Sequence, residues 1–173
     1  MTADHTSARD LPDEAATLSF AAELMAPLKA AGGVVFLHGN LGAGKTTFVR
    51  GCLRAAGFQG AVKSPTFTLV EEYMLDSLTL YHFDLYRLND PEELEWMGIR
   101  DYFRPGTLSF IEWPERGAGH LPDPDMALEL RYYPPGREAI LSFNTKHGQQ
   151  IRETLEIEAF PERLLKSECH LST

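Results

Sequence analysis

The sequence predicts an α/β fold, in which a mixed sheet is flanked by helices within a single domain. The string GNLGAGKT at residues 39–46 matches the phosphate-binding pattern GxxxxGK[ST]. An apolar run at 32–39 leads into it and a helical pattern at 46–56 follows, which is the strand–loop–helix context of a P-loop NTPase. Further strand-like runs come later, so strands should lie on both sides of the loop in sequence. The 173 residues suffice for one domain with its own core.

The amino-terminal part of the chain divides into two segments. Residues 1–10 show no periodic pattern, and we expect them to be disordered. A helix is expected from Pro12, because Asp13 and Glu14 suit a helix start and apolar residues follow at helical spacing. Pro27 should kink or end this helix, since it lacks a backbone donor.

The next two elements surround the glycine-rich string. The run GGVVFLHG at 32–39 is short and apolar, which predicts a buried central strand. The helix at 46–56 should place Phe48 and Cys52 on its packed side and end at Gly57.

The middle of the chain alternates in hydrophobicity. A β-hairpin is expected over 67–86, with its turn at 75–78. A helix should follow, with Asp90 as its N-cap, Pro91 at its first position and acids in its first turn. The apolar run at 107–113 predicts another strand.

The last third of the chain contains a second alternating region. Residues 126–144 read as a hairpin around a Pro-Pro-Gly turn. A weaker helix is expected at 150–165, interrupted by Pro161. We therefore expect a single domain over 11–165 and a tail at 166–173.

The overall composition narrows the class of protein. The formal net charge is −9, with 25 acids against 16 bases. This balance argues against a surface built to bind nucleic acid, because such surfaces neutralise phosphates with Lys and Arg. No apolar run approaches the roughly 18 residues of a membrane helix, and the acidic start does not resemble a secretory signal. Two widely separated cysteines, Cys52 and Cys169, favour a reduced cytoplasmic setting. Because long apolar runs are lacking, we expect no membrane partner.

The glycine-rich loop predicts binding of a nucleotide with Mg²⁺. Glycines let backbone N–H groups point at phosphate oxygens, and the following helix start adds a positive dipole end. Lys45 should reach the β- and γ-phosphates, and the Thr46 hydroxyl should ligate Mg²⁺. The loop residues expected to bind nucleotide are Gly39, Asn40, Leu41, Gly42, Ala43, Gly44, Lys45 and Thr46.

The nucleotide is expected to be ATP. The guanine-reading element of GTPases, Asn-Lys-x-Asp, has no match, because the nearest string, NTKH at 144–147, lacks both the spacing and the acid. No Asp is followed by Gly three positions later, so the Asp-x-x-Gly switch of GTPases is absent as well.

Phosphoryl transfer also requires acids near the metal. Glu112 closes an apolar run, and acids in that position lie at the carboxyl edge of a parallel sheet. It is the first candidate for ligating Mg²⁺, directly or through water, or for orienting the attacking water. Asp84 ends another strand-like run and is a second candidate, although a turn-initiating Asp is also consistent with the pattern. Thr66 is a candidate γ-phosphate sensor or simply a strand residue, and His82 is expected to be structural.

Several strings taken together resemble the TsaE family of tRNA threonylcarbamoyladenosine biosynthesis ATPases. They are GNLGAGKTTFVRG, VKSPTFTLVEEY, YHFDLYRLNDPEELEWMGIRDYF, IEWPERG and LPDPD, in this order over most of the chain. The resemblance implies a P-loop fold and Mg²⁺-dependent ATP hydrolysis. It also implies work with the related TsaB–TsaD pair, which modifies tRNA, so that tRNA is met only through the complex.

The resemblance also implies roles for individual residues. It assigns Lys45, Thr66, Asp84 and Glu112 to the reaction, with Thr46 and Glu112 at the metal. To the nucleotide site it adds Glu14, Thr47, Trp113 and Arg137. The family usually has Asp where this chain has Asn40, and we expect the lost charge to bear on Mg²⁺-bound water or on partner contacts while the backbone cradle is kept.

Other functions remain open at this point. A small-molecule P-loop kinase would need an acceptor site and an arginine-rich lid, and the string GIRDYFRPG contains few arginines. A nucleotide-binding scaffold without catalysis would need neither. No arginine is clearly placed as a finger in cis, although Arg137 is a candidate, so we expect weak hydrolysis by the chain alone.

Overall fold

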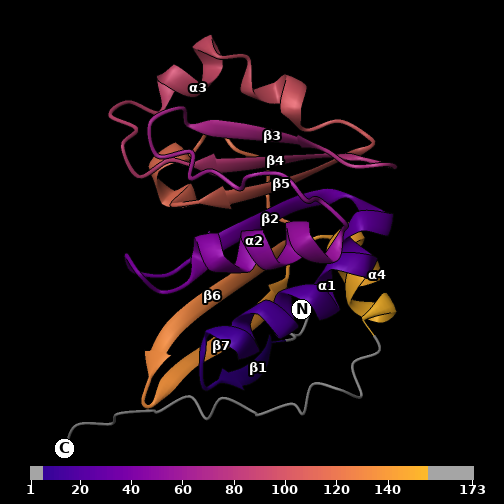
Figure 1. Ribbon diagram of the computed structural model, residues 1–173. Coiled ribbons are helices and arrows are strands. Elements are labelled where there is room, and N and C mark those ends of the chain that lie inside the picture. Colours follow the sequence, from indigo (N-terminus) through magenta and orange to yellow (C-terminus); the bar gives the residue numbers. More distant parts are fainter. Residues whose placement is uncertain (1–5, 156–173) are drawn as a thin grey trace, which may run out of the picture.

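The computed structural model describes residues 6–155, which build a single seven-stranded sheet with helices against it (Figure 1). The strands are β1 (Thr6–Leu11), β2 (Gly33–His38), β3 (Val70–Met74), β4 (Thr79–Asp84), β5 (Thr107–Glu112), β6 (Met126–Tyr133) and β7 (Gly136–Phe143). The helices are α1 (Glu14–Ala31), α2 (Lys45–Ala55), α3 (Glu92–Trp96) and α4 (Lys146–Thr154), with short 3₁₀ turns η1 (Ile99–Tyr102) and η2 (Pro114–Gly117). None of the helices within residues 6–155 is long and apolar enough to cross a membrane.

The sheet is parallel at its centre and antiparallel at its margins. Its order is β1-β7-β6-β2-β5-β4-β3. Strand β2 lies between its parallel neighbours β5 and β6, and β4 continues the parallel part beside β5. The predicted central strand and the predicted mixed sheet are therefore confirmed. The carboxyl ends of β2, β4 and β5 meet at one edge, which is where α/β sheets carry their sites.

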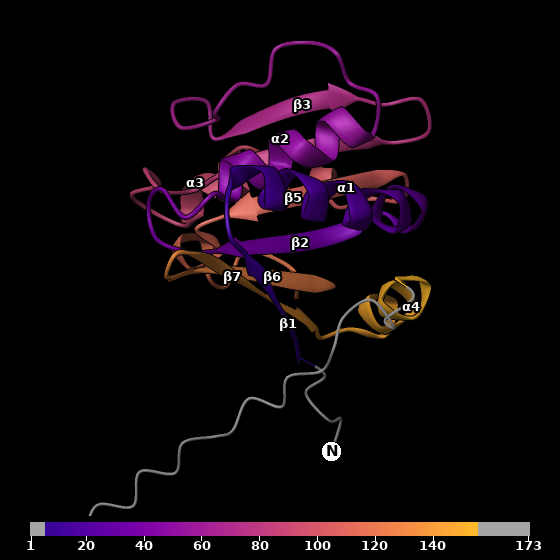
Figure 2. The same cartoon turned by 60° about the horizontal axis from the view of Figure 1, so that its bottom comes forward.

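Successive residues of the central strands pack alternately into two hydrophobic cores, one on each face of the sheet. Val35 and Leu37 of β2 pack with α1, α2 and α4 on one face of the sheet. Val34 points to the opposite face, where it packs with Leu94 of α3 and Ile99 of η1. Figures 1 and 2 show α1 and α2 side by side along the sheet, with α3 beyond the β3–β5 part. Two buried faces explain why these strands are apolar throughout.

Helices α1 and α2 approach each other closely at a glycine. A Cβ atom added to Gly51 of α2 would lie 2.8 Å from the Cβ of Ala21 in α1. The neighbouring Cys52 is fully buried and unpaired, as the sequence predicted. Helix α1 does not end at Pro27 but continues to Ala31. Packing along its whole length outweighs the one backbone hydrogen bond that proline removes.

The expected disorder of residues 1–10 is wrong for residues 6–10. They belong to β1, which pairs antiparallel with β7, and Leu11 lies opposite Arg137. The segment TSARDL is too polar to be recognised as a strand, and the exposed edge of β7 provides the backbone partners. Residues 1–5 lie outside the described part of the chain.

The two predicted hairpins are present, with a change in the first. Strand β3 pairs with β4 around the expected turn, where Leu75 N donates to Leu78 O at 2.9 Å. However, β3 begins at Val70 rather than at Phe67, and Leu69 has a left-handed φ of 64° that breaks the alternation. The second hairpin, β6–β7, forms as predicted.

The two remaining helices begin at positions that differ from the prediction. Helix α3 begins at Glu92 with Pro91 at its N-cap position, one residue later than predicted, although the carboxylate of Asp90 accepts from Glu92 N at 3.0 Å. Helix α4 starts at Lys146, earlier than expected, because the Thr145 hydroxyl caps it by accepting from Gly148 N at 2.9 Å. The rest of the expected 150–165 helix, and the 166–173 tail, lie beyond residue 155 and outside the described chain.

Candidate nucleotide and phosphoryl-transfer site

The loop between β2 and α2 forms a cradle that only glycine can build at two positions. Gly44 immediately precedes α2 with a φ of 107°, and Gly39 has a φ of 146°. A Cβ on Gly39 would lie 2.8 Å from the Leu130 carbonyl oxygen. The first turn of α2 contains no acidic residue of its own at the positive end of the helix dipole. The cradle is therefore suited to an anion such as phosphate.

Lys45 is held at the base of this loop. Its side chain is buried, its Nζ donates to the Gly39 carbonyl oxygen, and Nζ lies 4.0 Å from the centre of the Trp113 ring. Burial lowers the pKa of Lys45, and the nearby carboxylates of Glu112 and Asp84 oppose this shift. The ammonium group thus occupies a poorly hydrated position beside the loop, where a phosphate would be its natural partner.

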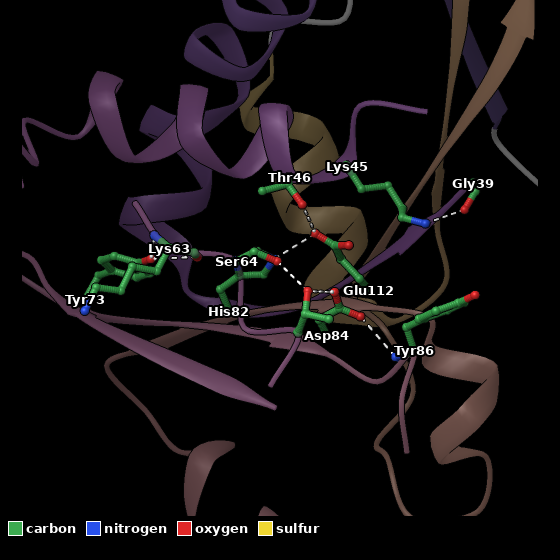
Figure 3. A network of polar contacts seen from close by, with 11 residues as sticks. Gly39, Lys45, Thr46, Lys63, Ser64, Tyr73, His82, Asp84, Tyr86 and Glu112 are labelled. Atoms are coloured by element: carbon green, nitrogen blue, oxygen red, sulfur yellow. Dashed lines mark hydrogen bonds and ion pairs between the residues drawn. The ribbon is translucent and has the colours of Figure 1, made fainter. Parts of the chain in front are cut away.

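Glu112, at the end of β5, connects the loop to the sheet. Its Oε1 accepts from the Thr46 hydroxyl at 3.0 Å and lies 2.8 Å from His82 Nε2 (Figure 3). The carboxylate is nearly fully buried. Since Leu37 of β2 is paired with Glu112, the acid lies directly beside the strand that enters the loop. The two residues that were expected to serve the metal, Thr46 and Glu112, are therefore in direct contact.

Asp84 occupies the corresponding position at the end of β4. Its Oδ1 accepts from Tyr86 N at 3.0 Å, and Oδ2 has a long 3.5 Å contact with the Thr66 hydroxyl. Burial raises the pKa of Asp84, and the negative charge of Glu112 adds to the rise, whereas the bond from Tyr86 N opposes it. Asp84 therefore lies inside the site and Thr66 at its margin, and the bond from Tyr86 N two residues on shows that Asp84 also begins a turn.

These groups surround one cavity of about 430 Å³. Its walls come from the loop, from the segment before β3 and from the ends of β4 and β5. The lining residues are Leu41, Gly42, Ala43, Gly44, Lys45, Thr46, Thr47, Ser64, Thr66, Asp84, Tyr86, Arg87, Glu112 and Trp113. The cavity thus brings together residues that lie far apart in the sequence and were expected to act together.

Four other expected site residues do not line this cavity. Gly39, Asn40 and Arg137 line a separate hollow of about 260 Å³ on the β6 side of the loop, where Arg137 donates to the Gly42 carbonyl oxygen at 2.8 Å. Glu14, at the start of α1, pairs with Arg50 at 2.9 Å. Arg137 thus supports the loop from outside the cavity, and Asn40 is exposed.

The sequence analysis missed His82 as a member of the site. His82 is fully buried, and it lies two residues before Asp84 on β4. Successive residues of a strand alternate between faces, so both side chains point to the face that carries Glu112. The period of two was therefore a usable signal, but only once β4 was known to lie beside β5.

The oxygen atoms of the site suit a hard cation that phosphate also coordinates. Within residues 6–155, no group of three or more His, Cys, Asp and Glu side chains could hold a metal by itself. Magnesium rarely needs such a group, because it binds one or two carboxylates together with phosphates and water. The Thr46 hydroxyl directs its hydrogen to Glu112, which leaves its lone pairs free. The residues present therefore fit Mg²⁺ bound with a nucleotide.

Comparisons with known proteins agree on one family. The family model described as "Threonylcarbamoyl adenosine biosynthesis protein TsaE" matches residues 11–139. The chain is 50% identical over 145 residues to the TsaE protein of Haemophilus influenzae, covering 82% of this chain and 92% of that one. It is 38% identical over 110 residues to TsaE of Bacillus subtilis, covering 64% and 68%.

A solved structure has the same architecture. The crystal structure of YdiB from Bacillus subtilis superposes with a TM-score of 0.72 at 27% sequence identity. The match covers 92% of this chain and 98% of that one. The likeness therefore extends over nearly the whole fold and is not limited to the loop.

Proposed function

The chain belongs to the TsaE family, whose members take part in tRNA threonylcarbamoyladenosine biosynthesis, and on that premise we propose that it is a Mg²⁺-dependent ATPase. In this proposal ATP hydrolysis supports turnover of the TsaB–TsaD transferase complex. The protein would act in the cytoplasm, where tRNA is modified, and would meet tRNA through its partners.

The hydrogen bond between Thr46 and Glu112 is the observation that carries this proposal. It links the phosphate loop to an acid on the neighbouring parallel strand at 3.0 Å. Such a pair is needed where a metal and a triphosphate are held together, and a simple phosphate-binding loop has no use for it. Bound Mg²⁺ would neutralise charge on the β- and γ-phosphates, with Thr46 and Glu112 holding it.

The protein's own groups divide the remaining work. The backbone of residues 42–46 and the Lys45 ammonium would hold the phosphates, because they form the wall next to the α2 amino terminus. Glu112 Oε1 is occupied by Thr46 and His82, whereas Oε2 has no hydrogen-bond partner within residues 6–155. Oε2 is therefore the atom proposed to accept a hydrogen bond from the attacking water, and Asp84 would support the metal shell from the next strand.

The arrangement of arginines supports slow hydrolysis by the chain alone. Arg87 lines the cavity, but its guanidinium lies 4.5 Å from the centre of the exposed Phe67 ring. Arg137 is bound to the outside of the loop. An arginine finger accelerates hydrolysis by about 10³–10⁵. Because Arg87 is stacked on Phe67 and Arg137 is bonded to the loop, we propose that partners stimulate the reaction.

The test measures inorganic phosphate release from Mg²⁺-ATP by the purified chain, alone and with TsaB and TsaD relatives. We expect slow release that the partners increase. Glu112→Gln should reduce the rate by about 10²–10⁴, the range for loss of a general base, while ATP still binds. Glu115→Gln is the matched control, because Glu115 is an exposed glutamate three residues away.

Three outcomes would contradict the proposal. Unchanged phosphate release by Glu112→Gln would indicate that the chain is a scaffold and that the activity is extraneous. Phosphate transfer to an added small-molecule acceptor, in place of release to water, would favour a kinase. Fast phosphate release by the chain alone, unchanged when TsaB and TsaD are added, would show that the partners do not stimulate the reaction.

A further inference from the structure

We propose that His82 is the positioning residue for Glu112. It would hold one carboxylate oxygen in place so that the other faces the cavity. This inference deepens the proposed ATPase function and rests on it. His82 would touch neither nucleotide nor water, and its effect would pass entirely through Glu112.

The geometry places two hydrogen-bond partners on the same carboxylate oxygen. His82 Nε2 lies 2.8 Å from Glu112 Oε1, and the Thr46 hydroxyl donates to that same oxygen at 3.0 Å. The two partners approach from β4 and from α2, as Figure 3 shows. A carboxylate held from two directions cannot rotate about its terminal bond without losing one of these contacts.

The other nitrogen of His82 supports a specific role for the ring. Nδ1 is buried and has no hydrogen-bond partner within residues 6–155. Burying a polar atom without a partner is unfavourable. The neighbours of His82 on this face include the fully buried Leu80 and Phe110, so an apolar side chain would suit the same space. The contact with Glu112 is therefore the reason for a histidine at this position.

The Glu112 carboxylate needs to be held in place because the carboxylate of Asp84 lies beside it. The two carboxylates are paired in register at the ends of β4 and β5. Their repulsion would rotate or displace Glu112 before a cation arrives. An imidazole that donates from Nε2 would fix Oε1 against this repulsion. Partners of this kind behind a metal ligand typically contribute 10–100-fold in metal affinity or activity.

The test compares His82→Leu, which cannot donate, with His82→Gln, whose amide can donate to Glu112. Three quantities are measured with the full chain: the turnover of ATP, the Mg²⁺ concentration that gives half-maximal turnover, and the ATP dissociation constant in EDTA. His82→Leu should lower turnover about 10–100-fold and raise the Mg²⁺ requirement, while Mg²⁺-free ATP binding is unchanged. His82→Gln should recover most of the loss. His147→Leu is the matched control, because His147 Nε2 bonds the Gly32 carbonyl oxygen at 3.1 Å and lies away from Glu112.

Wild-type turnover or an unchanged Mg²⁺ requirement in a folded His82→Leu variant would overturn the proposal. So would an equal loss in His82→Gln and His82→Leu. A fall in Mg²⁺-free ATP affinity that matches the fall in turnover would also overturn it, because a general loss of structure predicts that result.

A second measurement does not depend on activity or on the stability of a variant. Nitrogen-15 NMR of the wild-type protein should show His82 protonated at Nε2 and bare at Nδ1, with the signal assigned by its absence in His82→Gln. Glu112→Gln should shift this signal more than any other histidine signal. The opposite tautomer would overturn the inference. If the wild-type protein hydrolysed no ATP, the proposed function would fail, and the tautomer would still decide whether His82 holds Glu112.

Discussion

Asp84 and Glu112 are register partners at the carboxyl ends of two adjacent parallel strands, and both are buried. Two carboxylates in such proximity are unfavourable unless a cation joins them. The raised pKa of Asp84, caused first by burial and then by the charge of Glu112, expresses this cost. The two buried carboxylates therefore lower the free energy of unfolding of the protein when no cation is bound.

Replacing Asp84 with Asn should stabilise the empty protein and impair its reaction. Because the folded-state pKa of Asp84 is raised, its ionisation lowers stability as the pH rises through that pKa, and the penalty is absent below the pKa of the unfolded chain. At neutral pH we expect Asp84→Asn to gain about 0.5–2 kcal/mol, typical of relieving a strained functional site. The measurement is chemical unfolding over a range of pH without nucleotide or metal.

The pH dependence identifies the cause of that gain. The difference between Asp84→Asn and wild type should vanish at acid pH and grow as the pH rises. Asp101→Asn, at an exposed position, should show no such trend. A gain that is independent of pH would mean that improved hydrogen bonding, rather than removal of a buried charge, is responsible.

Lys45→Ala should abolish nucleotide binding without unfolding the protein. The variant loses the contacts of Nζ with the Gly39 carbonyl and the Trp113 ring, and it also relieves a buried cation, so the free energy of unfolding should change by about 1 kcal/mol or less. Mg²⁺-ATP stabilises only the native state, so binding appears as a rise in melting temperature. We expect that rise to disappear in Lys45→Ala and to persist in Lys146→Ala, which changes an exposed lysine of α4. An undiminished shift in Lys45→Ala would contradict the role of Lys45.

Phe67→Ala should weaken stimulation by the partners. The Phe67 side chain is 83% exposed, although it lies next to Thr66, which lines the cavity. Large exposed aromatics are common hot spots of interfaces, and a surface change typically alters stability by no more than about 0.5 kcal/mol. The measurement is phosphate release with increasing TsaB–TsaD.

Trp96→Ala is the control for that experiment, because Trp96 is 79% exposed and lies on α3. We expect this variant to be stimulated like the wild type. If Phe67→Ala were stimulated equally well, the segment around Thr66 would not be the surface that senses the partner.

Gly51→Ala should destabilise the fold, although alanine favours helices. The new methyl group would lie 2.8 Å from the Ala21 Cβ and 3.3 Å from the Leu18 Cα, so one helix has to move. Overpacking costs about 1–3 kcal/mol, against a propensity gain of about 1 kcal/mol, and the net loss should be on the order of 1 kcal/mol. Urea unfolding checks this value.

The double variant Ala21→Gly with Gly51→Ala returns the space to the interface. The double variant should lose less free energy of unfolding than the two single variants lose together, because the two residues are in contact. Simple additivity would show that the close approach of α1 and α2 does not limit the packing.

Features that depend on neighbouring residues could be predicted from the sequence. The phosphate loop, the helix after it, both hairpins and the acid at the end of β5 were all found in short continuous patterns. The loop and its helix are defined within residues 39–56, and period-two apolar runs identify the strands. Tertiary contacts outweighed local preference in the polar edge strand β1, and α1 continues past Pro27 instead of ending there.

The sequence by itself thus determined that this protein has a glycine-rich loop between a strand and a helix, together with an acid at a strand end. Only the tertiary structure decided that His82 and Asp84 join Glu112, and that Arg137 lies outside the cavity. Local patterns fix which residues form a strand, but neighbours and register depend on hydrogen bonds between distant segments. A shift of one residue between β4 and β5 would turn His82 away from Glu112, and no single stretch of sequence encodes that alignment.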